Sequence, residues 1–201
     1  MDLTPVTLAG RHVRLVPLTL EHVPALWEVA NDDDLWRWTL SHPRSEDDMR
    51  RYVQAALDTQ ARGGAMPFAT LEAATGRVIG STRYHNIEPP HRRVEIGYTF
   101  VARPWQRTPA NTEAKYLMLR HAFETLACVR VELRTNALNQ RSRNAILRIG
   151  GVEEGTLRRH MANDAGQFRD TVYFSILDDE WPGVKDRLEA QLARPWTPAA
   201  P

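Results

Sequence analysis

The stretch between Arg103 and Asn144 constrains the fold more than any other part of the chain. It contains a polar turn, Gln106-Arg107-Thr108, directly before Pro109, a residue type favoured at the first position of a helix. An amphipathic pattern, a strand and a second, polar helix from Asn139 follow. A turn that ends at a helix N-terminus presents backbone N–H groups and a favourable dipole to an anion. This order predicts a phosphate-binding turn with polar side chains from the second helix beside it.

Composition limits the kind of protein that this sequence can specify. With 26 Lys and Arg against 25 Asp and Glu, the formal charge is +1, so we expect no nucleic-acid partner. The single cysteine, Cys128, excludes an intrachain disulfide and a multi-cysteine metal site, and its apolar neighbours favour a buried thiol. No signal pattern is visible, and no apolar run approaches the ~20 residues of a membrane helix. We therefore expect a cytoplasmic protein with no metal and no membrane partner.

Apolar periodicity predicts one domain over residues 11–193. Residues 1–10 form an N-terminal extension, and residues 194–201 a Pro-rich flexible tail. Strands are expected at 11–17, 66–71, 78–87, 93–101, 129–135, 152–161 and 167–177, and helices at 20–30, 45–61, 108–125, 139–149 and after 178. Hairpin strands, then alternating strands and helices, then a further hairpin predict an α+β (mixed α/β) sheet covered by helices.

Residues Trp105 to Lys115 resemble the acyl-CoA pyrophosphate loop of the GNAT acyltransferase superfamily, in the branch of the ribosomal-protein N-terminal acetyltransferases. The resemblance extends from Arg11 to about Trp181. It implies a GNAT-like domain whose mixed, mostly antiparallel sheet is splayed at the cofactor site. The family's pattern is Gln or Arg, two residues, Gly, one residue, then Gly or Ala, and Pro109 occupies the glycine position here. The expected phosphate contacts are Gln106, Arg107, Thr108, Ala110, Asn111 and Thr112.

The resemblance also implies contacts with the rest of acetyl-CoA, the acyl-donor cosubstrate. On strand 93–101 the alternation places Val94, Ile96, Tyr98 and Phe100 on one face and Glu95, Gly97 and Thr99 on the other. In the family the end of this strand splays from its neighbour, which assigns Phe100 and Val101 to the pantetheine arm. Gly97 would leave room for the thioester. Asn139 would bind a pantetheine amide, cap its own helix, or do both.

The implied reaction is transfer of an acetyl group from acetyl-CoA to a primary amine, which must first lose a proton. Glu95 is the candidate base, directly or through water; the alternative is a structural salt bridge with Arg92 or Arg134. Ser142 resembles the family position whose hydroxyl protonates the departing thiolate, with a solvated helix serine as the alternative.

The acceptor side is less determined by the sequence. His85, Trp36 and Trp38 are the candidate acceptor contacts, with core or surface packing as the alternative. The aspartates Asp32 to Asp34 would attract a cationic amine or simply form a solvated helix end. We expect Arg169 to pair with Asp170. The acceptor could be a protein N-terminal α-amino group or a small amine such as an aminoglycoside or a polyamine. A non-catalytic acyl-CoA-binding module and a homodimer also remain open.

Overall fold

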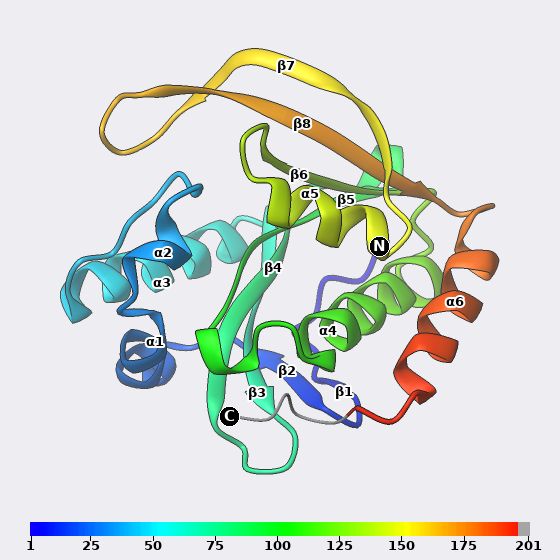
Figure 1. Cartoon of the computed structure of the whole chain (residues 1–201), viewed down its shortest axis with the longest axis horizontal. Coiled ribbons are helices and arrows are strands. Elements are labelled where there is room, and N and C mark those ends of the chain that lie inside the picture. The colour runs from blue at the N-terminus through cyan, green and yellow to red at the C-terminus, as the bar shows by residue number, and fades with distance from the viewer. Residues whose placement is uncertain (197–201) are drawn as a thin grey trace.

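The computed structural model describes residues 1–196, so only the start of the expected tail at 194–201 is described (Figure 1). Within this range the strands form one eight-stranded sheet in the order β1-β2-β3-β4-β5-β6-β8-β7. The strands are β1 (Leu8–Ala9), β2 (Val13–Pro17), β3 (Ala65–Glu72), β4 (Val78–Glu88), β5 (Arg93–Val101), β6 (Arg130–Asn136), β7 (Val152–Ala162) and β8 (Phe168–Leu177). In the described sheet, β5 and β6 are parallel and the other neighbours antiparallel. The α+β class and the mixed, mostly antiparallel sheet are confirmed.

The helices in the described chain are η1 (Leu20–His22), α1 (Val23–Ala30), α2 (Asp33–Trp36), α3 (Glu46–Ala61), η2 (Pro89–His91), η3 (Arg103–Trp105), α4 (Pro109–Arg120), the π-helical η4 (His121–Thr125), α5 (Gln140–Arg148) and α6 (Trp181–Ala193). A side-chain cap precedes α2, α3, α4 and α5. Ser45 caps α3, since its Oγ accepts from the Asp48 N–H at 3.1 Å. The helix expected over 108–125 is present as α4 continued by η4.

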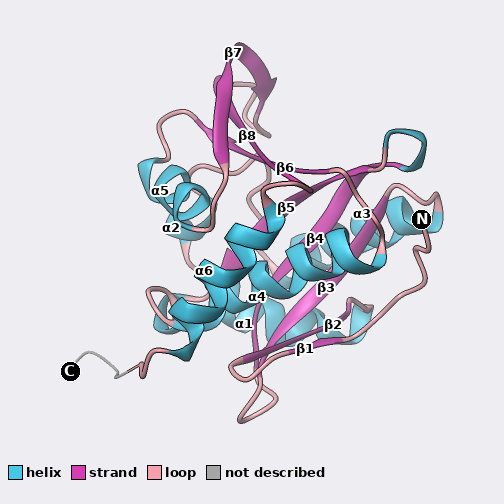
Figure 2. Ribbon diagram, turned by 90° about the vertical axis from the view of Figure 1, so that its right-hand side faces the viewer, coloured by secondary structure: helices cyan, strands magenta, loops and turns pink. Residues whose placement is uncertain are grey.

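Helices cover the sheet on both sides. Figures 1 and 2 show α1 and α3 against one face of the central strands and α4 with α6 against the other. Within the described chain, the buried apolar side chains form two clusters that correspond to these layers. One includes Leu26, Met49 and Val53 from α1 and α3; the other includes Met118 and Leu188 from α4 and α6. The central strands β3, β4 and β5 are therefore fixed from both faces.

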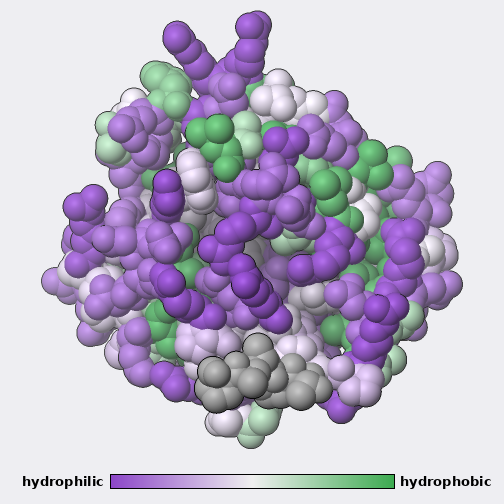
Figure 3. Space-filling view, viewed as in Figure 1, coloured by the Kyte–Doolittle hydropathy of each residue, from purple (hydrophilic) through white to green (hydrophobic). Residues whose placement is uncertain are grey.

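Strands β5 and β6 separate after a short pairing. Arg93 to Glu95 pair with Arg130 to Glu132, and no further pairs join these two strands in the described chain. Beyond this point β6 pairs with β8 and β5 pairs with β4. The gap between β5 and β6 lies between the helical layers. Figure 3, which has the same view as Figure 1, shows that the hydrophilic surface is hollowed near its middle. The splay expected from the resemblance is thus present.

A bulge in β5 corrects the expected alternation. Tyr98 has φ +50°, and the pairing with β4 shifts register between Ser81 and Arg83. As a result Tyr98 packs over His85, on the face that also bears Glu95, with ring centroids 4.9 Å apart. Phe100 joins the cluster of α1 and α3, whereas Thr99 turns toward α4. The assignment of Tyr98 and Phe100 to the face of Val94 and Ile96 was wrong, because the extra residue reverses the period of two.

Candidate active site

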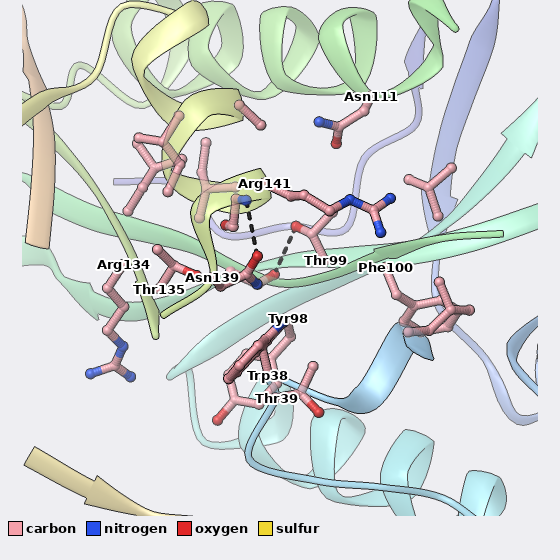
Figure 4. Close-up of a pocket in the computed structure, with 18 of the residues that line it drawn as sticks. Trp38, Thr39, Tyr98, Thr99, Phe100, Asn111, Arg134, Thr135, Asn139 and Arg141 are labelled. Carbon is pink, nitrogen blue, oxygen red and sulfur yellow. Dashed lines mark hydrogen bonds between the residues drawn. The ribbon is translucent and has the colours of Figure 1, made fainter. Parts of the chain in front are cut away.

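A cavity of about 620 Å³ opens where β5 and β6 separate. Its walls come from β5, β6, the N-terminus of α4, the inner side of α5 and the segment 34–41. In Figure 4, Trp38, Thr39 and Tyr98 lie on one side of the cavity and Asn111 on the other. The predicted site residues that line it are Trp36, Trp38, His85, Glu95, Phe100, Val101, Gln106, Arg107, Thr108, Asn111, Asn139 and Ser142.

The loop before α4 is tied to its neighbours by Gln106. The Gln106 Nε2 donates to the Val101 carbonyl at 2.9 Å, and its Oε1 accepts from Arg141 Nη2 at 2.5 Å. The backbone of Arg107 adopts the left-handed conformation with φ +61°, which is unfavourable for residues other than glycine. Thr108 caps α4, its Oγ1 accepting from the Ala110 N–H at 3.2 Å. The loop is therefore held in a defined turn at the mouth of the cavity.

Two of the expected phosphate contacts stay outside the cavity wall. Ala110 is buried in the core, and its N–H is engaged by Thr108. The buried Thr112 hydroxyl accepts from Arg148 Nη2 at 3.4 Å. Asn139 caps α5, because its Oδ1 accepts from the Ser142 N–H at 3.1 Å. Asn139 therefore caps its own helix, which was one of the two roles expected for it. Asn139 also lines the cavity.

Glu95 lies at the point where the two strands part, and its carboxylate is almost fully buried. Oε1 contacts Arg134 Nε at 2.8 Å and His85 Nε2 at 3.2 Å, and Oε2 accepts from Asn86 Nδ2 at 2.8 Å. Burial acts to raise the pKa of Glu95, but His85, Arg134 and Asn86 outweigh it and hold this pKa below its ordinary value. Glu95 is therefore ionised at neutral pH, and the salt bridge with Arg134, given above as the alternative to a base role, is present.

Gly97 has no side chain, and this leaves room for the imidazole of His85. A Cβ at position 97 would lie 2.5 Å from His85 Nε2, closer than any real contact allows. Gly97 therefore lets the imidazole reach Glu95 across the strand pair, a role that the sequence alone did not indicate. His85 and Glu95 are direct partners in the β4–β5 register, so the sheet itself brings the two groups together.

Helix α2 and the residues after it supply one wall, and two of the three aspartates at the start of α2 are paired with an arginine. Arg103 pairs with Asp32 at 2.9 Å and with Asp34 at 3.1 Å, while Asp33 contacts His42 at 3.0 Å. Arg103 thus offsets the charge of two of the three carboxylates that were expected to form a negative rim.

The two tryptophans of this segment differ in burial. Trp36 packs against Phe100 in the core, with ring centroids 5.0 Å apart, and donates from Nε1 to the Ala30 carbonyl at 2.8 Å. Trp38 is half-buried, and Arg37 lies over its ring at 5.0 Å. Trp38 is therefore the better placed of the two to contact a ligand.

Lys115 is a cavity residue that the sequence analysis missed. Its ammonium is buried on the inner face of α4 and donates to Thr99 Oγ1 at 2.6 Å and to Thr82 Oγ1 at 3.2 Å. Burial lowers its pKa to about 7. The available signal was weak: Lys115 is one of two lysines in an arginine-rich chain and lies next to Ala114 on the apolar side of the helix.

Other sequence expectations concern groups outside the cavity. Cys128 is buried, and burial raises the pKa of its thiol to about 11, as expected of an unreactive cysteine. Among residues 1–196, no three or more His, Cys, Asp or Glu side chains gather in a way that could hold a metal ion. In the same range no helix has the length and apolar character needed to cross a membrane.

The splayed sheet, the capped helix N-terminus at the mouth of the cavity and the buried carboxylate characterise an α+β domain with a cavity in its sheet. The chain belongs to the GNAT acetyltransferase family, since the model of the acetyltransferase (GNAT) domain matches residues 12–152. It is similar to a solved structure of a candidate acetyltransferase from T. thermophilus. The TM-score is 0.87 and the identity 39%, over 96% of this chain and 100% of that one.

Two further proteins that this chain resembles bear names that mention a ligand or a target. A Bacillus subtilis protein, YdaF, named as a candidate ribosomal N-acetyltransferase, is 34% identical over 110 residues. That match covers 55% of this chain and 59% of the relative's own length. Mycobacterium smegmatis RimJ, solved in complex with CoA-disulfide, shares the fold with a TM-score of 0.83 over 97% of this chain and 99% of its own, at 22% identity.

Proposed function

We propose that this chain transfers an acetyl group from acetyl-CoA to a primary amine, with a protein N-terminal α-amino group as the leading acceptor. The observation that supports this most directly is the cavity between β5 and β6, which extends from the N-terminus of α4 to Glu95. One end suits a phosphate, and the other holds an ionised group that can accept a proton. The family's activity and the names of the relatives agree with this assignment.

The residues around α4 fit a pyrophosphate. The first-turn amides of a helix lack intrahelical acceptors, and its dipole favours an anion. Arg107, Arg141 and Arg148 add positive charge on the cavity wall. The edge of β5 from Ile96 to Val101 faces the gap and can pair with the extended pantetheine arm. In this proposal these groups hold acetyl-CoA with its thioester toward Glu95.

The chemistry requires an unprotonated amine. Its nitrogen loses a proton and forms the amide bond while the thioester C–S bond breaks, and the departing thiolate takes up a proton. Glu95 accepts the amine proton through His85 or a water molecule, because its own oxygens are already occupied by neighbours. Ser142 lines the cavity on α5 and can return a proton to the thiolate. That step contributes modestly, since a thiol with a pKa of ~8.5 is already a fair leaving group.

The alternatives are acetylation of a small amine and binding of acyl-CoA without catalysis. An ionised carboxylate and a hydroxyl that line the same cavity favour an enzyme over a binding module. The decisive assay incubates the protein with acetyl-CoA and a panel of N-terminal peptides and small amines, and measures thiol release. Transfer to peptides is the expected result. If CoA raises the melting temperature but no amine is acetylated, the binding-module alternative holds instead.

A further inference from the structure

The charge of the inner part of the cavity points to a particular class of acceptor. We define the Trp38 chamber as the part of the cavity lined by Trp38, His85, Glu95, Arg134 and Arg169. These five residues include two arginines, Arg134 and Arg169, and one carboxylate, Glu95. Arg37, over the Trp38 ring, adds a further positive charge at the rim.

Both oxygens of the Glu95 carboxylate already have partners. Oε1 is shared by Arg134 and His85, and Oε2 accepts from Asn86. Asp34, the other carboxylate among the described residues of the cavity wall, is paired with Arg103 at 3.1 Å. Neither acid is therefore free to neutralise a second guanidinium.

The guanidinium of Arg169 is the second positive group of the Trp38 chamber. Its Nη1 donates to the Trp38 carbonyl at 2.5 Å, and its buried Nε has no acceptor in the part of the chain that the structure describes. The expected partner, Asp170, instead accepts from the Arg159 N–H at 2.7 Å, so the predicted pair with Arg169 was wrong. Burial and the nearby charge of Arg134 both lower the pKa of Arg169. A guanidinium that is repelled by its neighbour and lacks an anion favours an anionic ligand.

We propose that the acceptor is an amine that carries a carboxylate close to its reacting nitrogen, and that Arg169, beside Arg134, binds this carboxylate. The inference rests on the proposed function, because it concerns the substrate of the same site. Arginine suits the role, since its planar fork can bind a carboxylate through two hydrogen bonds. A polycationic amine would bring like charge into the chamber and is disfavoured. The carboxylate can belong to a free amino acid or to an acidic side chain at the second position of a peptide.

The test compares three peptide amides that share one α-amine: Ser-Glu-Ala, Ser-Gln-Ala and Ser-Lys-Ala. Free serine and serinamide form a parallel pair for the amino-acid source. We expect kcat/KM to be about tenfold or more higher for the Glu peptide than for the Gln peptide, and lowest for the Lys peptide. A preference for serine over serinamide, without a preference among the peptides, would assign the carboxylate to a free amino acid.

Variants separate charge recognition from a structural role. Arg169→Met should remove the preference for the acidic acceptor, through a rise in KM that is larger for the Glu peptide than for the Gln peptide, and Arg169→Lys should restore part of the preference. Arg14→Met, the same change on the exposed side of β2, is the matched control and should change nothing. Equal losses for all three peptides in Arg169→Met would overturn the inference.

A binding measurement keeps the inference separate from the proposed function. Calorimetry with N-acetyl-Ser-Glu-Ala amide and its Gln counterpart, on CoA-saturated protein, needs no turnover. If the Glu product binds more tightly than the Gln product, and Arg169→Met abolishes this difference, the carboxylate site is supported. This holds even if no amine is acetylated, and in that case only the proposed function fails. Transfer to amines without any charge preference, together with equal binding of the two products, refutes the carboxylate site alone.

Discussion

Arg134 and the buried Glu95 form an ion pair, with Nε 2.8 Å from Oε1, at the residue where β5 and β6 part. Glu95 carries a negative charge at the inner end of the cavity. Its pKa is lowered by His85 and by Arg134, so the carboxylate is a weaker base than an ordinary glutamate. Glu95 thus has structural contacts in the sheet, and the proposed base role would be a second role of the same carboxylate.

Replacing Glu95 by Gln should separate those roles. The amide keeps the shape but cannot accept a proton, so we expect turnover to fall by ~10²-fold or more with CoA affinity near that of the wild type. Steady-state kinetics and a CoA titration measure the two effects. Full activity would move the base to another group, with His85 the next to examine.

The pH dependence of Glu95 follows from the direction of its shift. Its pKa in the folded chain is lowered, so the unfolded chain binds the proton more readily, and the carboxylate contributes stability above its unfolded pKa that is lost as pH falls through its folded pKa. Unfolding of wild type and Glu95→Gln at pH 7 and at pH 3.5 should show a larger difference at pH 7. A constant difference would contradict the assigned shift.

Arg107 offers a paired test of donor binding. Arg107→Glu reverses the charge at the proposed phosphate site and should weaken the CoA-dependent rise in melting temperature. Arg107→Gly removes the charge but suits the left-handed backbone at φ +61°, so it should weaken CoA binding less and raise the stability of the free protein. An unchanged response to millimolar CoA in Arg107→Glu would place the phosphates elsewhere.

Lys115→Met should stabilise the protein most near and below neutral pH. The folded pKa of about 7 lies below the unfolded value of ~10.4, so the unfolded chain binds more protons between these values and stability rises with pH across that window. At pH 6.5 the cost of burying the charge is almost fully present, and we expect Tm to rise by about 3 °C or more. The gain should shrink toward pH 10. A lower Tm at both pH values would show that the bonds to Thr99 and Thr82 dominate.

Glu113 has a purely structural task in this fold. Its carboxylate accepts from the N–H groups of Arg11 at 2.9 Å, His12 at 2.6 Å and Val13 at 2.7 Å, and so fastens the turn between β1 and β2 to α4. Glu113→Gln should lower the unfolding free energy by about 2 kcal/mol, because hydrogen bonds to a charged group are replaced by weaker ones. Denaturant unfolding measures this loss, and CoA affinity should stay the same.

Replacing Asp32, Asp33 and Asp34 together by Asn should change KM for an acceptor by no more than about twofold, since exposed and already paired charges act weakly on a ligand. Stability should fall slightly, because the pairs with Arg103 are lost. A large, salt-sensitive rise in KM for a cationic amine would restore these aspartates as the acceptor rim and argue against the carboxylate site at Arg169.

The sequence by itself determined the features that depend on neighbouring residues. The cap at Thr108 with Pro109, the turn from Gln106 and the cap at Asn139 were all predictable, because the groups that interact lie within a few positions of one another. Periodicity likewise located most strands and helices, since one face of each must be buried.

Only the tertiary structure decided what surrounds the reactive groups. Glu95 meets His85 and Arg134 because β4, β5 and β6 lie side by side, and the bulge at Tyr98 depends on how β5 pairs with β4. Arg169 lost its expected neighbour because successive side chains of a strand point to opposite faces. Charges and hydrogen bonds act through space rather than along the chain, so the ionisation of Glu95 and the approach of Arg169 to Arg134 had no local signature, and the burial of Lys115 had only a weak one.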